Sequence, residues 1–173
     1  MFRRKKKFES KISLTKIIKA HLATLRDINT NRPGWDDYFS FLILPILITG
    51  AFIFVGFDIN ENTIETLVGG LAIFVGLLFN AMVILLDLAR KHDDQKIKII
   101  IAKELTANIS FAIILSFVAI FLFLLGFIDD IPDWAKLIID TIGVFLLVEF
   151  FVIFLMILKR TYILFYKEIG EEF

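Results

Sequence analysis

The residue with the clearest chemical potential in the sequence is Glu149, a carboxylic acid inside a long apolar run. Residues 137–158 contain one other acid, Asp140, and no Lys, Arg or His that would pair with Glu149. An unpaired carboxylate in hydrocarbon favours its neutral form, and such residues are functional candidates by default. Glu149 is therefore the first candidate for a site that handles ions or protons.

Three other polar residues lie at a similar depth in other apolar runs. If each run is a helix, Thr49, Asn80 and Ser116 lie within about one helical turn of the depth of Glu149. The sequence thus predicts one buried polar layer. This layer is either a hydrogen-bond cluster that fixes the register of the helices or a path for ions or protons through a bundle or an oligomer.

A stripe of small and polar residues follows one side of the second apolar run. Gly69, Gly76, Asn80 and Asp87 are separated by seven, four and seven residues, which places them along one line of a helix. Glycines let another helix approach closely, and an asparagine hydrogen-bonds across such a contact. The stripe predicts a packing seam, either inside a four-helix bundle or between the subunits of a homo-oligomer.

Four apolar runs must position these side chains. Their ranges are 39–57, 66–86, 105–128 and 137–158. The first three contain no charged residue, and each run is long enough to cross about 30 Å of hydrocarbon as a helix. In the fourth run the many apolar side chains outweigh the cost of Glu149, about 3 kcal/mol on insertion scales. We therefore expect an all-α, polytopic membrane protein with four transmembrane helices in a bundle, the first of them kinked at Pro45.

The composition agrees with a membrane protein. Of the 173 residues, 58% are hydrophobic and the mean hydropathy is +0.79, whereas soluble domains are about 45–50% apolar. The 19 basic and 19 acidic residues cancel, so the net charge offers no argument for a nucleic-acid partner. The chain contains no cysteine, which excludes disulfides and thiolate metal sites.

The distribution of charge predicts the orientation. Basic residues concentrate in segments 1–38, 87–104 and 159–173, whereas the two other connections are acidic and contain Lys136 as their only base. Cytoplasmic segments carry the excess of Lys and Arg. Both termini are therefore expected in the cytoplasm of a bacterium, and the protein in its inner membrane.

The N-terminal basic segment contains an amphipathic stretch from Ser10 to Ile28. Its apolar residues recur at helical spacing: Leu14, Ile17, Ile18, Leu22, Leu25 and Ile28. Its basic residues mostly point elsewhere: Lys11, Lys16, Lys19 and Arg26. This pattern predicts a cytoplasmic helix on the anionic inner leaflet of the bilayer. Alternatively, the helix docks a cytoplasmic protein partner or pairs with the helical loop 87–104.

Enzymatic chemistry has few candidate residues. His92, followed by Asp93 and Asp94, is the only group that resembles a metal or acid–base cluster, and a solvated charged turn also explains it. There is no glycine-rich phosphate loop, Gly-flanked serine or His-Glu zinc pair. The sequence predicts a non-enzymatic protein without a cofactor or metal, and an enzyme using His92 is the less favoured alternative.

In its overall plan the chain resembles the small four-span membrane subunits of bacterial antiphage defence systems, of which the Kiwa membrane component is one. The features that carry this resemblance are the four runs, the basic cytoplasmic face and the short outer loops. The resemblance implies a membrane sensor or effector that oligomerises and signals to a cytoplasmic protein. We expect such a function, with a small ion channel or proton-coupled carrier organised around Glu149 as the alternative.

Overall fold

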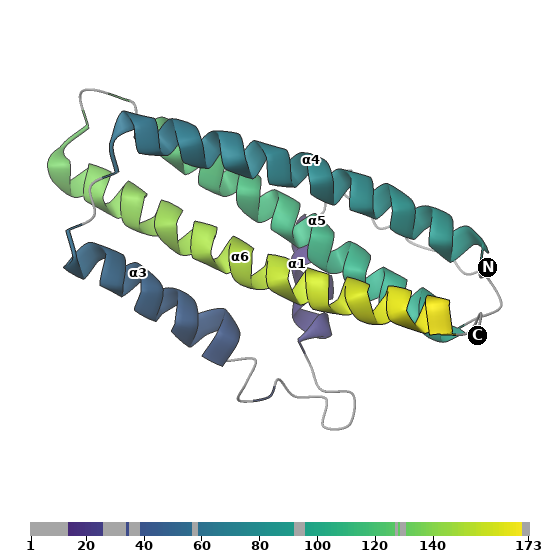
Figure 1. Ribbon diagram of the computed structural model, residues 1–173. Helices are drawn as coiled ribbons and strands as arrows, with labels where there is room; N and C mark the ends of the chain where they lie inside the picture. Colours follow the sequence, from purple (N-terminus) through teal and green to yellow (C-terminus); the bar gives the residue numbers. More distant parts are fainter. Residues whose placement is uncertain are drawn as a thin grey trace, which may run out of the picture.

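The computed structural model describes residues 14–25, 34, 39–56, 59–91, 96–126, 128 and 131–170. Within these ranges all regular structure is helical and no strand occurs, which confirms the predicted all-α class. The elements, in chain order, are α1 (Leu14–Thr24), a π-helical turn η1 (Phe39–Ile43), α3 (Leu44–Phe54), α4 (Glu61–Lys91), α5 (Lys96–Leu125) and α6 (Asp133–Gly170) (Figure 1).

Three of these helices are long and apolar enough to cross a membrane. Their apolar stretches are Glu61–Asp87 in α4, Ile100–Leu125 in α5 and Asp133–Tyr166 in α6. A bilayer requires about 20 apolar residues in a helix, and each stretch exceeds this length. The chain is accordingly a membrane protein with transmembrane helices.

The count of four spans is not supported, because the predicted first span is shorter than expected. The apolar helix ends at Phe54 and comprises η1 and α3, of 5 and 11 residues. Together they extend about 24 Å, which is less than the thickness of the hydrocarbon. The helix ends because Gly56 adopts the left-handed conformation, with a φ of 69°, as is common just after the end of a helix.

Pro45 lies where the helix type changes. It occupies the first turn of α3, directly after η1, where a missing backbone N–H costs little. The irregularity predicted at Pro45 therefore takes the form of a π-helical entry followed by a regular α-helix.

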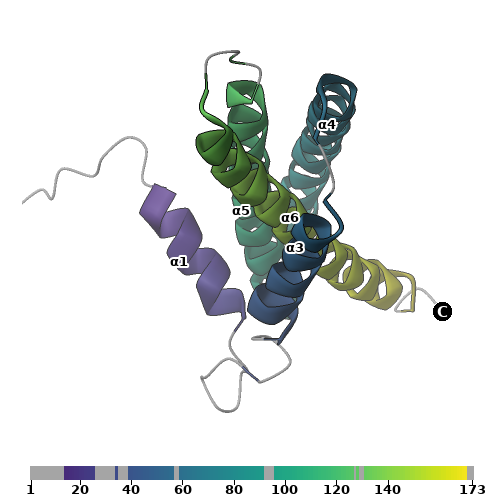
Figure 2. The same cartoon turned by 90° about the vertical axis from the view of Figure 1, so that its left-hand side faces the viewer.

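α5 is the central helix of the molecule. α4, α6 and α1 all pack against it, whereas α3 packs along α6 (Figure 1, Figure 2). The core contains the fully buried side chains of Phe123, Phe150, Leu105, Ile109, Ile153 and Leu164. The ring of Phe74 on α4 meets three rings of α6 edge to face, with centroid distances of 5.1 to 5.8 Å. These contacts hold the long helices side by side.

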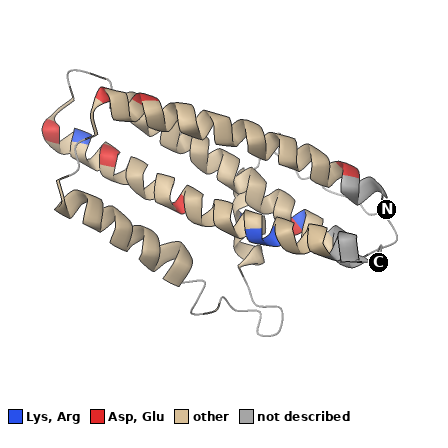
Figure 3. Cartoon of the chain, in the orientation of Figure 1, with Lys and Arg blue, Asp and Glu red and all other residues tan. Residues whose placement is uncertain are grey.

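Large apolar surfaces face outward from the bundle. Ile73, Leu77 and Val83 on α4 have exposed fractions of 68%, 57% and 62%. Contiguous apolar surface of this kind is rare on soluble monomers and is normal where lipid covers a helix. Charged side chains lie towards the two ends of the bundle, apart from a single acid midway along α6 (Figure 3).

Replacing Gly143 by alanine should destabilise the bundle. A Cβ atom at Gly143 would lie 2.8 Å from Cε1 of Phe123, and that ring is fully buried. Overpacking of this kind costs about 1–3 kcal/mol, which a lower thermal unfolding temperature in detergent would report. Gly70→Ala is the matched control, because no atom lies within 4 Å of its added Cβ. Equal unfolding temperatures for the two variants would contradict the packing described for α5 and α6.

Candidate functional site

A cluster of polar side chains joins α1 to α5 and α6. We call it the α1 junction and define it by His21, Thr24, Glu104, Asn108 and Arg160. Three of these residues are buried, since His21, Thr24 and Asn108 have exposed fractions of 2%, 9% and 0%. Buried polar groups destabilise a protein unless they are hydrogen-bonded. The geometry of the cluster therefore decides whether α1 docks.

The amide oxygen of Asn108 accepts hydrogen bonds from α1. Nδ1 of His21 lies 2.9 Å from Oδ1 of Asn108, which assigns the hydrogen of the ring to Nδ1 because the amide oxygen only accepts. The hydroxyl of Thr24 lies 2.7 Å from the same oxygen and 2.7 Å from the carbonyl oxygen of His21. Its one hydrogen is shared between these acceptors. A single amide on α5 thus fixes both the position and the rotation of α1.

The other amide atom of Asn108 has no such partner. Nδ2 is buried and has no hydrogen-bond partner in the part of the chain that the structure describes. Leaving a buried donor unsatisfied costs about 1–3 kcal/mol. The hydrogen bonds of the junction therefore stabilise docking less than a fully satisfied network would.

The imidazole of His21 is enclosed by aromatic rings. It stacks on Phe111 of α5, with centroids 4.1 Å apart and an angle of 12° between the planes. Phe41 of η1 meets it edge-on at 6.3 Å. Burial lowers the pKa of His21, the hydrogen bond to Asn108 opposes this effect, and the positive charge of Arg160 lowers the pKa further. The docked state therefore holds His21 as a neutral ring.

Arg160 connects the junction to α6. Nη1 donates to Oε2 of Glu104 at 2.9 Å, and Nη2 donates to the carbonyl oxygen of Thr24 at 2.8 Å. Thr24 is the last residue of α1, where carbonyl groups have no partner within the helix and a cation is favourable. The Arg160 and Glu104 side chains are 25% and 39% exposed, so solvent screens this ion pair. α6 thereby caps the end of α1.

α1 presents two different faces. His21 and Thr24 face α5, whereas Leu14, Ile18 and Leu22 form an outward stripe with exposed fractions of 46%, 38% and 51%. Figure 1 shows α1 crossing the long helices rather than running along them. The predicted amphipathic helix therefore docks on the bundle through polar side chains and keeps apolar side chains on its surface.

The structure describes two of the four basic residues that are predicted to contact the membrane or a partner. Lys16 and Lys19 are exposed on α1, whereas Lys11 and Arg26 lie outside the described residues. The helix does pair with α5, but farther along the chain than loop 87–104, because α1 contacts Asn108 and Phe111.

The four residues of the predicted polar layer lie in different environments. The hydroxyl of Ser116 donates to the carbonyl oxygen of Ala112 on its own helix at 2.9 Å, as a short hydroxyl side chain readily does. Thr49 is buried, Glu149 is half-buried, and neither Oγ1 of Thr49 nor Oε2 of Glu149 has a hydrogen-bond partner among the described residues. Asn80 is exposed on α4. Within the described part of the chain no hydrogen bond joins any two of them, so the layer stays a prediction.

The glycine stripe of α4 faces away from the other described helices. Gly69, Gly76, Asn80 and Asp87 are all exposed, and no atom lies within 4 Å of a Cβ added at either glycine. The interpretation as a seam inside the bundle is therefore wrong for the described part of the chain. The reason is that α4 packs on α5 through its opposite face, which carries Leu71, Val75, Leu78 and Leu85.

The α1 junction is not among the sites predicted from the sequence. One available signal was Asn108, the only amide side chain in residues 105–128, since a polar side chain in a membrane helix seeks a partner. Another was the spacing of Ile17, His21 and Thr24 along one side of a helix. His92, Asp93 and Asp94 lie outside the described residues, and within the described ones no three His, Asp or Glu gather to hold a metal ion.

Comparisons with known proteins give no match. No family model, curated protein or solved structure is similar to the chain.

Lowering the pH should loosen the docking of α1. Because the docked state holds His21 below its ordinary pKa of 6.5, the undocked state binds more protons. The stabilisation is complete above about pH 6.5 and is lost below it, at up to about 1.4 kcal/mol per pH unit. Hydrogen exchange of the α1 amides, corrected for its intrinsic pH dependence, should therefore accelerate as the pH falls below about 6.5.

The variant His21→Phe provides the control for this effect. It keeps a ring that stacks on Phe111 but cannot gain a proton, so exchange in α1 should show no extra acceleration in acid. If wild type and His21→Phe respond equally to pH, titration of His21 does not govern docking.

Proposed function

We propose that the protein is a non-enzymatic, multi-pass membrane sensor or effector that passes the state of its helical bundle to a cytoplasmic partner through α1. The observation that carries this proposal is the α1 junction. Asn108 of α5 and Arg160 of α6 both bond to α1, so the position of α1 depends on how α5 and α6 pack against each other. A displacement of either helix removes hydrogen bonds from buried groups.

The proposal includes four membrane-crossing elements, with η1 and α3 as the shorter fourth one and with both termini in the cytoplasm. The distribution of basic residues supports this orientation. A short apolar segment is accommodated by local thinning of the bilayer or by oligomerisation. In this arrangement α1 lies at the inner surface of a bacterial inner membrane. Lys16 and Lys19 then face the anionic lipid headgroups, and the outward stripe of Leu14, Ile18 and Leu22 faces the hydrocarbon.

A homo-oligomer is the second part of the proposal. The exposed stripe with Gly69, Gly76 and Asn80 is suited to a close helix–helix contact in lipid, where small residues permit approach and an amide bonds across the contact. A sensor or effector that oligomerises is also what the resemblance to the antiphage membrane subunits implies. Weighing the purified complex in mild detergent measures the number of subunits.

Movement of α1 in response to the membrane tests the main proposal. The chain has no cysteine, so Ala23→Cys on α1 and Ile73→Cys on α4, both exposed, allow a pair of spin labels to be placed in vesicles. Dissipating the membrane potential or adding a pore-forming peptide should shift the distribution of distances between the labels. Arg160→Gln should produce a similar shift in untreated vesicles, because it removes the cap of α1.

Lys159→Gln is the matched control for Arg160→Gln. It makes the same change of charge at the neighbouring, exposed position and should leave the distances unchanged. An α1 that stays docked under every membrane condition, or an Arg160→Gln variant with wild-type distances, would contradict the proposal.

A second candidate function is a path for ions or protons at Glu149, favoured by one observation. Oε2 of this residue is buried and lacks a hydrogen-bond partner within the described part of the chain. A carboxyl oxygen in this environment is available to bind a proton or an ion. In proteoliposomes, Glu149→Gln should reduce ion or proton flux at least about tenfold while leaving assembly intact, since the amide keeps the shape and cannot ionise. Equal flux through the variant and the wild type would exclude an ionising role.

A further inference from the structure

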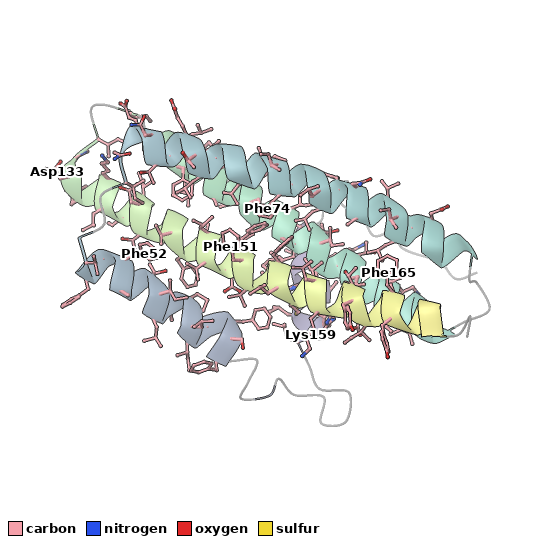
Figure 4. All side chains as sticks on the ribbon, viewed as in Figure 1. Phe52, Phe74, Asp133, Phe151, Lys159 and Phe165 are labelled. Carbon is pink, nitrogen blue, oxygen red and sulfur yellow. The ribbon has the colours of Figure 1, made fainter. Side chains whose placement is uncertain are left out.

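A cleft between α3 and the first turns of α6 lies at the end of the bundle opposite to the α1 junction. It has a volume of about 410 Å³, within the usual range for ligand sites of about 300–1,000 Å³. Figure 4 places Phe52 of α3 and Asp133 of α6 at this end, and Lys159 and Phe165 at the other. Apolar side chains supply much of its wall: Phe52, Ile53, Ile59, Leu137 and Val144. The cleft is thus able to hold part of a hydrocarbon molecule.

A buried hydroxyl lies at the inner end of the cleft. Thr49 is the lining residue of α3 that is farthest from the end of this helix at Phe54. It is only 5% exposed, and its Oγ1 has no hydrogen-bond partner among the described residues. A second hydroxyl that lines the cleft, on Thr141, already donates to the carbonyl oxygen of Leu137 at 2.7 Å. Because a buried hydroxyl without an acceptor is destabilising, a molecule that accepts a hydrogen bond from Thr49 would be stabilised there.

The charged residues described in the cleft lie on α6, nearer to its mouth. Asp133 and Lys136 are in the first turn of the helix, and Asp140 lies one turn farther in. The opposite charges of Asp133 and Lys136 are three residues apart on one side of the helix, where such charges offset each other. Asp140 already has a partner within the chain. These charges therefore give little selection for an ionic headgroup.

The depth of Asp140 disfavours a phospholipid. Because α3 and α6 run in opposite directions (Figure 1), Thr49 and Val144 both lie at the inner end of the cleft. Along α6, Asp140 is about 6 Å from Val144, and Lys136 is about 12 Å from it. The phosphate of a phospholipid follows its acyl ester by one glycerol unit, so an ester at Thr49 would place the phosphate beside the carboxylate of Asp140 before it reached Lys136. An uncharged headgroup avoids this repulsion.

We propose that this cleft binds an uncharged lipid through a carbonyl group that accepts a hydrogen bond from Thr49. A carbonyl oxygen brings no hydrogen that would need a partner of its own, so it suits a largely apolar cleft. Diacylglycerols carry such carbonyls in their acyl esters, and isoprenoid quinones carry them on a ring. Ile46, one turn before Thr49 on α3, is exposed, so the hydrocarbon chains can continue from the cleft into the bilayer. This site goes beyond the proposed sensor function and does not depend on the behaviour of α1.

Native mass spectrometry of the full-length protein tests the proposal. The delipidated protein is mixed with equal amounts of dioleoylglycerol, ubiquinone, the dioleyl diether of glycerol and dioleoyl-phosphatidylglycerol. The diether has the same chains as dioleoylglycerol and no carbonyl, so at least one of the two carbonyl lipids should be retained about fivefold more than the diether. The carbonyl lipid that is retained more identifies the source of the carbonyl group. The proposal is overturned if neither exceeds the diether, or if phosphatidylglycerol is retained as strongly as the better carbonyl lipid.

Two hydroxyl variants assign the binding to Thr49. Thr49→Val keeps the shape of the side chain and removes the hydroxyl, so retention of the carbonyl lipid should fall about fivefold, to the level of the diether. Thr141→Val is the matched control and should bind like the wild type, because the hydroxyl of Thr141 also lines the cleft but is already bonded to Leu137. Thr49→Ser keeps a hydroxyl and should keep the preference for the carbonyl lipid.

A further variant tests the place of binding without touching the hydroxyl. Ile53→Trp adds bulk at a lining position that is 48% exposed, so it should block retention while the protein still folds, and it carries the test if Thr49→Val does not fold. Two results would show that the lipid binds elsewhere. One is a folded Thr49→Val variant that retains the carbonyl lipid as strongly as Thr141→Val does, and the other is wild-type retention by Ile53→Trp.

Discussion

The packing of three helices around α5 is the constraint on which the rest of the structure depends. The spanning stretch of α5, Ile100–Leu125, is predominantly apolar and has no single apolar face, and a helix of this kind has to be covered all round by protein or lipid. α4 and α6 cover two of its sides, and α1 covers part of a third near the cytoplasmic end of the proposed topology (Figure 2). In lipid there is no hydrophobic drive for helices to associate. Close packing of side chains such as Phe123 and Phe150 therefore supplies most of the cohesion.

The buried amide of Asn108 makes the packing of α1 on α5 specific for one orientation. An apolar surface on α5 would accept α1 at many rotations, whereas an amide oxygen that accepts from His21 and Thr24 permits only one. The same contact places a titratable ring against Phe111 and brings the end of α1 to Arg160. Specific docking is thus achieved at the cost of an unsatisfied amide nitrogen. A contact that is specific and only moderately stable is what a reversible element requires.

The sequence predicts the helical class and the apolar helices because a bilayer imposes a local rule, about 20 apolar residues in succession. That rule does not predict where the helices end. The conformation of Gly56 shortens the first apolar helix, and α6 continues past residue 158 because Ile157 and Leu164 extend its buried side. The α1 junction was missed for a different reason. His21 and Asn108 are 87 residues apart, and no local pattern shows which polar side chain of one helix meets that of another.

The cleft between α3 and α6 and the α1 junction share one element, the helix α6. The cleft uses residues of α6 near Asp140, and the junction uses Arg160, about 30 Å along the same helix. Because α6 is one continuous helix from Asp133 to Gly170, a sliding or rotation of this helix against α5 would displace both ends. The contacts at its middle are aromatic rings, Phe150, Phe151 and Phe154 against Phe74, and interlocked side chains resist small continuous displacements. Any communication between the ends of this bundle therefore has to occur as a shift between discrete packing arrangements of α6.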